Sequence, residues 1–301
     1  MNIVIIGASI AGHTVATALR EANKACSITL IGRSPYPAYD KRRFLDYLTG
    51  SAKEKDLFLV APDYYQEHGI QFLKECLVTS VGTIRKQVTY KNKDDRRASL
   101  DYDFLVVCSG RSTELPDVAG INKEGVYTLD SLVNFKDFRT HLITEPVCIM
   151  GSGPGALSVA QALAAKRKEV KLISSGLAVP ENPNCYVDTI ATDVVELIGE
   201  AGIQAVKLSE GKIIGTSLPV FMPEPKKANV DFFKNGEIEL SDGAIRVNET
   251  MCTNVPGVLA CGSVCVKPSD AQGVKSWEET INESKVLLSS WSARSEDRYV
   301  G

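Results

Sequence analysis

Two glycine-rich turns, each directly after an apolar run, constrain the fold of this chain of 301 residues more than any other feature. The first reads VIIGASIAG (residues 4–12) and the second reads CIMGSGPGALS (residues 148–158). A glycine turn after a strand lets backbone N–H groups approach a diphosphate, and the start of the following helix adds partial positive charge there. One such turn is weak evidence for a dinucleotide-binding unit, but two in one chain indicate two units.

Each turn lies inside a segment with the same predicted order of elements. Residues 2–34 and 146–176 both run apolar strand, glycine turn, helix-period segment, short polar link and apolar strand. This order and its length of about 30 residues are typical of a strand–helix–strand unit. The apolar residues expected on one face of the two helices are Val15, Ala18 and Leu19 and then Val159, Leu163 and Ala164.

Two further apolar strands end in turns of small residues, LDYDFLVVCSG (residues 100–110) and VPGVLACGSVC (residues 255–265). Residues 87–102, which lead into the first of these strands, alternate in polarity and are highly charged. They predict a solvated hairpin or meander. We therefore expect four short strand-to-turn junctions built on one plan.

Composition excludes several function classes. Hydrophobic residues make up 44% of the chain, enough for two cores, and the net charge of −3 provides no overall field to recruit nucleic acid or anionic lipid. The apolar run at the amino terminus is too short for a signal peptide or a membrane span, so we expect a cytoplasmic protein.

The cysteines favour packing over catalysis. Most of the eight lie in apolar strand-like runs, and no Cys-x-x-Cys pair occurs. Buried thiols are the expectation in a reducing compartment. The alternative is a redox pair of Cys261 and Cys265, because both flank a predicted cofactor turn. No set of metal ligands is expected.

The order of motifs resembles the flavin-dependent pyridine nucleotide-disulfide oxidoreductase superfamily, in particular its branch of NADH oxidases, nitrite reductase flavin modules, and rubredoxin or ferredoxin reductases. The matching segments are IVIIGASIAG (3–12), ITLIGRSPYPAYDKR (28–42), YDFLVVCSGRSTELPDVAGI (102–121), CIMGSGPGALS (148–158) and DGAIRVNETMCTNVPGVLACGSVC (242–265). The resemblance implies an α/β fold of the glutathione reductase type, with two Rossmann-like dinucleotide-binding domains, the second inserted into the first. Residues 1–113 and 246–301 would form the FAD-binding domain and residues 114–245 the NAD(P)-binding-type domain. We expect the family's C-terminal dimerisation domain to be missing.

The resemblance also implies two sets of cofactor-binding residues. Those expected to bind FAD are Gly7, Ser9, Ile10, Ala11, Gly12, Arg33, Ser34, Lys41, Val78, Ser109, Gly110, Arg111, Gly262 and Ser263. Those expected to bind NAD(P) are Gly151, Gly153, Gly155, Ala156 and Ser174. No catalytic side chain is assigned.

Several positions depart from the family pattern. Ser34 and Ser263 stand where the family has acidic residues that contact FAD, and Ser174 stands where a glutamate would mark NAD. A family lysine near the flavin is replaced by Asp46, and its glutamate partner is replaced by Ser158. An ion pair is therefore lost from both sides at once.

Two hypotheses follow, and they differ in class. The first is an FAD-dependent oxidoreductase that moves electrons between NAD(P)H and a small redox protein acceptor, such as an iron–sulfur protein. The second is an FAD-carrying electron-transfer or assembly subunit of a larger redox complex, with a degenerate nicotinamide site. A chain that binds no flavin at all is the third alternative.

Overall fold

The computed structural model describes residues 1–142, 146–175, 187–224, 226–234, 236–270 and 275–296. The chain forms two compact units. The first unit comprises residues 1–40, 58–111 and 227–301, and the second comprises residues 41–57 and 112–226. The second unit is thus built mainly from a segment inserted into the first.

A five-stranded parallel sheet forms the centre of the first unit. Its strand order is β19-β7-β1-β2-β3, with β19 (Val258–Ala260), β7 (Phe104–Val107), β1 (Asn2–Ile6), β2 (Ser27–Ile31) and β3 (Ile70–Leu73). All four residues of β7 are buried, as are the last four of β1 and of β2. Strands covered on both faces are expected to be continuously apolar, which is how these runs appear in the sequence.

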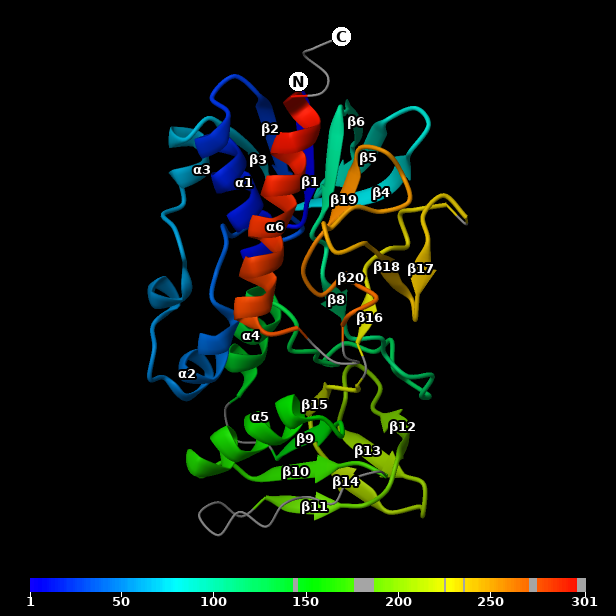
Figure 1. Cartoon of the computed structure of the whole chain (residues 1–301). Helices are drawn as coiled ribbons and strands as arrows, with labels where there is room; N and C mark the ends of the chain where they lie inside the picture. Colours follow the sequence, from blue (N-terminus) through cyan, green and yellow to red (C-terminus); the bar gives the residue numbers. More distant parts are fainter. Residues whose placement is uncertain (143–145, 176–186, 225, 235, 271–274, 297–301) are drawn as a thin grey trace. The chain divides into compact units, whose positions relative to one another are not determined.

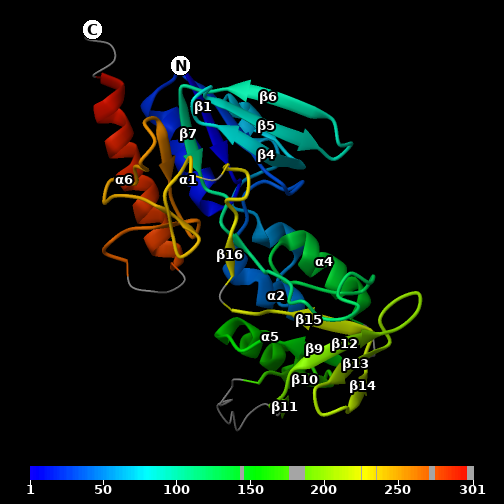
Figure 2. The same cartoon turned by 90° about the vertical axis from the view of Figure 1, so that its right-hand side faces the viewer.

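Layers cover both faces of this sheet. Helices α1 (Ile10–Ala22) and α6 (Trp277–Glu296) pack against each other on one side, and an antiparallel meander lies on the other (Figures 1 and 2). The meander consists of β4 (Cys76–Gly82), β5 (Gln87–Asn92) and β6 (Arg97–Asp101). Its β5–β6 hairpin confirms the hairpin or meander expected over residues 87–102. The short helix α3 (Tyr64–Glu67) precedes β3.

The rest of the first unit consists of short strands near the chain crossings. Strand β8 (Arg111–Ser112) pairs with β16 (Lys227–Ala228), where the chain returns from the inserted segment. A small sheet joins β17 (Leu240–Ser241), β18 (Ala244–Arg246) and β20 (Cys265–Val266).

The second unit repeats the strand–helix–strand plan. Its parallel sheet has the order β11-β10-β9-β15, with β11 (Asp188–Ile190), β10 (Val170–Ile173), β9 (Val147–Met150) and β15 (Leu218–Phe221). Helix α5 (Pro154–Ala165) joins β9 to β10. A second core packs β9, β10 and β15 against an antiparallel sheet of β12 (Val194–Ile198), β13 (Ala205–Leu208) and β14 (Ile213–Gly215).

The helices bury nearly the predicted faces. Val15 and Leu19 of α1 and Val159 and Leu163 of α5 are buried, as predicted. Ala18 and Ala164 are only half-buried; Ala16 and Ala160 take their places. These small side chains, two and four positions earlier than predicted, permit close packing on the sheet.

The unit boundaries differ in two places from the domain boundaries expected from sequence. Residues 41–57 belong to the second unit because α2 (Phe44–Thr49) packs on α4 (Leu132–His141) and α5. The rings of Phe44 and Phe135 lie 4.4 Å apart there. Residues 227–245 belong to the first unit, where Val230 and Phe233 join its core. In the described part of the chain, no helix is long and apolar enough to span a membrane.

Candidate functional site

The first glycine turn connects β1 to α1 and has a backbone that only glycine can form. Gly7 has a φ of +109°, and a Cβ built on it would lie 2.2 Å from the Cys108 carbonyl oxygen. A Cβ on Gly12 would lie 1.8 Å from the Gly7 carbonyl oxygen. The turn therefore packs tightly against the end of the neighbouring strand β7, and side chains are excluded on that side.

The start of α1 is suited to an anion. Ser9 is the N-cap, with φ −87° and ψ −170°, yet no described side chain, its own included, caps the helix, and the first turn carries no acidic residue. The first N–H groups of a helix need partners, and its positive dipole end favours a negative ligand. Ile10 and Ala11, both expected at the FAD diphosphate, lie in this first turn.

Two more small-residue turns lie at the same edge of the sheet, because parallel strands end together. Ser109 and Gly110 follow β7, and Gly262 and Ser263 follow β19. A Cβ on Gly262 would lie 3.2 Å from the Ala11 Cβ, so this turn reaches the start of α1. Three of the sequence-predicted FAD segments thus meet at one edge of one sheet.

Asn229 ties the turn after β7 to the returning chain and was not predicted from sequence. Its Nδ2 donates to the Ser109 carbonyl at 2.9 Å, its backbone N–H donates to the Gly110 carbonyl at 2.9 Å, and its carbonyl accepts from the Ser109 hydroxyl at 2.7 Å. In the same region, Arg111 Nε donates to the Ser263 carbonyl at 2.7 Å. These bonds fix the backbone of residues expected at FAD.

A buried carboxylate on α6 holds the turn after β19. Glu283 is 4% exposed, and its Oε2 accepts the Gly262 backbone N–H at 2.9 Å. The Lys275 ammonium pairs with Glu283, and also with Asp270 at 3.1 Å. Burial opposes the charged form of Lys275, but the neighbouring Cys265 thiol and these carboxylates raise its pKa above the ordinary value. Sequence analysis missed this cluster, whose members are far from the glycine turns in the chain.

The remaining expected FAD residues are placed less centrally. Arg33 and Ser34 follow β2, and the Ser34 hydroxyl accepts from the Tyr36 backbone N–H at 3.3 Å. Val78 is buried in β4, whose first residue, Cys76, donates its N–H to the Gly32 carbonyl. Lys41 belongs to the second unit, where its Nζ donates to the Asp130 carbonyl at 2.9 Å.

The described thiols are buried. Cys108 and Cys261 lie with their Sγ atoms 3.5 Å apart at the ends of β7 and β19. Their contact and their burial raise the pKa of the Cys108 thiol well above its ordinary value, and burial also raises the pKa of Cys265. Because the thiolate is the reactive form, the raised pKa values disfavour reaction at Cys108 and Cys265. Cys185 lies outside the described residues.

The second glycine turn has the same plan as the first. A Cβ on Gly151 would lie 2.4 Å from the Met222 carbonyl oxygen, and one on Gly155 would lie 3.7 Å from the Met222 side chain. Gly153 is the N-cap of α5, and Ala156 is buried in that helix. Ser174 follows β10 and donates its N–H to the Ile190 carbonyl.

A glutamate side chain lies against the middle glycine of the second turn. A Cβ on Gly153 would lie 2.5 Å from the Glu224 Cγ and 3.2 Å from its Oε1. Glu224 follows β15, the strand beside β9, and was not singled out from sequence. The two turns therefore differ in charge.

The helix α2 brings Asp46 to the element that carries Ser158. Helices α2 and α5 pack together, but Asp46 pairs with Arg43 at 3.9 Å and the Ser158 hydroxyl donates to the Pro154 carbonyl of its own helix at 2.8 Å. Helix α5 has no charged residue, so no ion pair can join these two helices.

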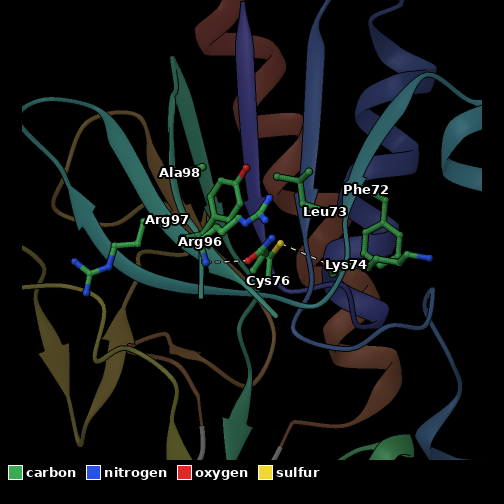
Figure 3. Close-up of a pocket in the computed structure, with 9 residues that line it drawn as sticks. Phe72, Leu73, Lys74, Cys76, Arg96, Arg97 and Ala98 are labelled. Atoms are coloured by element: carbon green, nitrogen blue, oxygen red, sulfur yellow. Dashed lines mark hydrogen bonds between the residues drawn. The ribbon is translucent and has the colours of Figure 1, made fainter. Parts of the chain in front are cut away.

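A separate cavity of about 370 Å³ lies in the first unit beside the ends of β3 and the β5–β6 hairpin (Figure 3). Lys74, Arg96 and Arg97 make its lining cationic. Cys76 forms part of its wall and donates its Sγ–H to the Lys74 carbonyl at 3.3 Å. None of the sequence-predicted cofactor residues lines this cavity.

Comparison with known proteins identifies the family. Residues 1–283 match the family model described as pyridine nucleotide-disulphide oxidoreductase. The chain belongs to this family. The fold is accordingly the expected α/β architecture with Rossmann-like domains, and the family is one of FAD-containing, NAD(P)H-dependent oxidoreductases.

Individual members of the family resemble the chain at about a quarter identity. An NADH oxidase of Methanocaldococcus jannaschii is 24% identical over 90% of this chain and 64% of its own length. The assimilatory nitrate reductase electron transfer subunit of Bacillus subtilis is 24% identical over 87% of this chain and 35% of its own length. The solved covalent complex of putidaredoxin reductase with putidaredoxin matches 95% of this chain and 74% of the solved chain at a TM-score of 0.82 and 24% identity. This chain thus spans between about a third and two thirds of those two curated relatives.

The residues of this chain fit an FAD diphosphate at the first turn. Its glycines leave the backbone bare, the start of α1 has no described cap, and the only described carboxylate bonded to the adjacent turn, that of Glu283, is already paired with Lys275. At the second turn, a diphosphate fits only when the Glu224 side chain moves, because that side chain fills the space beside Gly153.

Proposed function

We propose that the protein is an FAD-dependent oxidoreductase that moves electrons between NAD(P)H and a small redox protein acceptor. The convergence of three small-residue turns at the carboxyl edge of the first unit's sheet carries this proposal. When bound, FAD supplies the hydride and single-electron chemistry. The free thiols among the described cysteines support a reducing location, the cytoplasm.

The chain's own groups would bind and orient FAD. The first N–H groups of α1 would hold the FAD diphosphate, and the bare backbone at Gly7 and Gly12 allows close approach. Asn229 and Glu283 hold the turns of Ser109 and Gly262 rigid beside it. The raised pKa values of the Cys108 and Cys265 thiols disfavour dithiol exchange there, which supports a protein acceptor over a disulfide substrate.

Partner proteins are part of the proposal. The resemblance to a putidaredoxin reductase and to an electron transfer subunit supports a small redox protein, such as an iron–sulfur protein, as the acceptor. Neither the net charge nor any described helix favours nucleic acid or a membrane span as a partner.

A specific observation favours a second candidate, an FAD-carrying electron-transfer or assembly subunit of a larger complex. Asp46 and Ser158 lie on packed helices without the ion pair of the related enzymes. Electrons would then reach FAD from another protein, and the inserted unit would serve for packing.

Anaerobic titration of the purified protein separates the candidates. The visible spectrum and extracted FAD first establish flavin content, with a colourless protein contradicting both candidates. Bleaching of the flavin band by NADH or NADPH, followed by its return on adding oxidised ferredoxin, supports the first. Bleaching by a reduced iron–sulfur protein but by neither nucleotide would leave only the second.

A further inference from the structure

The position of Glu224 at the second glycine turn has no counterpart at the first turn. In a glycine-rich dinucleotide turn, the second glycine leaves the space through which the diphosphate approaches. Here that glycine is Gly153, and the Cγ, Cδ and Oε1 atoms of Glu224 all lie within 3.2 Å of the place its Cβ would take. Part of the diphosphate space is therefore filled by an acidic side chain.

The two units have equivalent strands at this point, so they can be compared position by position. In the first unit, the carbonyl of Cys108 packs against the first glycine of the turn, and Gly110 follows two residues later. In the second unit, the carbonyl of Met222 packs in the same way, and Glu224 follows two residues later. Where the first unit has a glycine, the second has a carboxylate.

The surroundings favour a negative group in this position. No described side chain caps α5, and its first turn contains no acidic residue, so its positive end is available to an anion. Glu224 is exposed, so its side chain can turn into solvent without disrupting the hydrophobic core of the second unit. An arriving diphosphate would need the N–H groups at the start of α5, and the carboxylate would repel it while it remains beside Gly153.

We propose that the Glu224 carboxylate occupies the anion position of the second glycine turn and competes with the diphosphate of NAD(P)H. This inference rests on the proposed use of a nicotinamide dinucleotide at that turn. Glu224 is then a specificity residue that weakens binding of every ligand with a diphosphate at Gly153. The dinucleotide binds when the side chain swings out.

Three variants test the proposal in the FAD-loaded protein. Glu224→Gln keeps the size and removes the charge, and Glu224→Ala removes both. Glu200→Gln makes the same charge change at an exposed site between β12 and β13. Isothermal titration calorimetry with ADP-ribose and with NADH measures affinity, and anaerobic flavin bleaching by NADH is followed separately.

We expect both Glu224 variants to bind ADP-ribose and NADH about two- to fivefold more tightly than the unchanged protein, the factor that corresponds to one charged contact at an exposed helix start. Glu200→Gln should bind as the unchanged protein does. Equal affinities in all proteins, with flavin bleaching by NADH intact, would overturn the inference and leave the proposed function standing. Tighter binding by Glu224→Ala alone would also overturn it, because bulk rather than charge would then be responsible. No binding and no bleaching in any protein would remove the nicotinamide donor and the inference together.

Discussion

Gly7 is the single residue on which the first turn depends most. Alanine there would be strained at φ +109°, and its Cβ would collide with the Cys108 carbonyl. We expect Gly7→Ala to lower the free energy of unfolding by about 2–4 kcal/mol and to abolish FAD retention. Urea unfolding and extracted FAD measure the two effects.

The matched control for Gly7 is Gly69→Ala. Gly69 also has a positive φ, +63°, but no described atom lies within 4 Å of its added Cβ. This variant should lose only about 1 kcal/mol and keep its FAD. Equal losses in the two variants would contradict the role assigned to the close approach.

Asp130, in the second unit, is expected to make a measurable contribution to the free energy of unfolding. It accepts from the Thr113 N–H at 2.7 Å and pairs with Lys226. Burial raises the pKa of the Asp130 carboxyl, but the hydrogen bond and charge of Lys226 and the bonds from Thr113 outweigh it, so the pKa lies below its usual value. Its stabilising contribution is therefore present above the unfolded pKa of about 4 and is lost as pH falls through the folded pKa.

Asp130→Asn should destabilise the protein by about 1–3 kcal/mol at neutral pH, because Lys226 loses its partner. The difference from the unchanged protein should shrink in acid, as the carboxyl protonates. The urea unfolding midpoints of the variant and of the unchanged protein, measured from pH 7 downward, give this difference. Asp193→Asn, at an exposed position, is the control. A difference that stays constant with pH would count against the ion pair.

At the scale of elements, α6 holds the turn after β19 through Glu283. Glu283 reaches from the helix to the Gly262 N–H and pairs with Lys275, whose side chain is 11% exposed. Glu283→Ala leaves that ammonium buried without its main partner and should cost about 3–5 kcal/mol. It should also weaken FAD binding, because the turn after β19 loses its anchor.

Fluorescence titration of the refolded apoprotein with FAD, together with urea unfolding, measures both effects of Glu283→Ala. Glu249→Ala removes an equal charge at an exposed site of the same unit and should leave both values unchanged. Because the pKa of Lys275 is raised, the cluster contributes fully below the unfolded lysine pKa and loses its effect as pH rises through the folded value. If Glu283→Ala binds FAD as tightly as the unchanged protein does, the Glu283–Lys275 cluster has no role in FAD binding.

At the scale of the whole molecule, each unit has its own core, so a ligand of one unit should stabilise that unit. FAD at a hundredfold excess over its dissociation constant should add about 2.7 kcal/mol. Hydrogen exchange with mass spectrometry should show slower exchange in β1, β7 and β19 on adding FAD to apoprotein. Slowing confined to β9, β10 and β15 would place FAD in the other unit.

Much of the fold could be predicted from local sequence pattern. The runs β1-α1-β2 and β9-α5-β10, the meander and the strands before Cys108 and Cys261 all lie where the apolar periodicities predict them. The glycines of both turns were also identifiable, since a bare backbone at a strand–helix junction leaves a clear sequence mark. Which binding roles these turns have is still a prediction.

Contacts between segments far apart in the chain could not be predicted from local sequence patterns. Asn229 bonds to Ser109 across 120 residues, and Glu283 of α6 bonds to Gly262 across 21 residues. Glu224 follows β15 and was not singled out from sequence, because its contact with Gly153 joins segments about 70 residues apart. Residues 41–57 carry the motif of the first unit but pack with the second.

The chain's local patterns were therefore sufficient for two strand–helix–strand units, their glycine turns and their buried faces. The charge placed at each turn depended on three-dimensional folding. The physical reason is that backbone periodicity acts between near neighbours, whereas the order of strands in a sheet chooses which loops share an edge. That order leaves the first turn bare and puts Glu224 in the second.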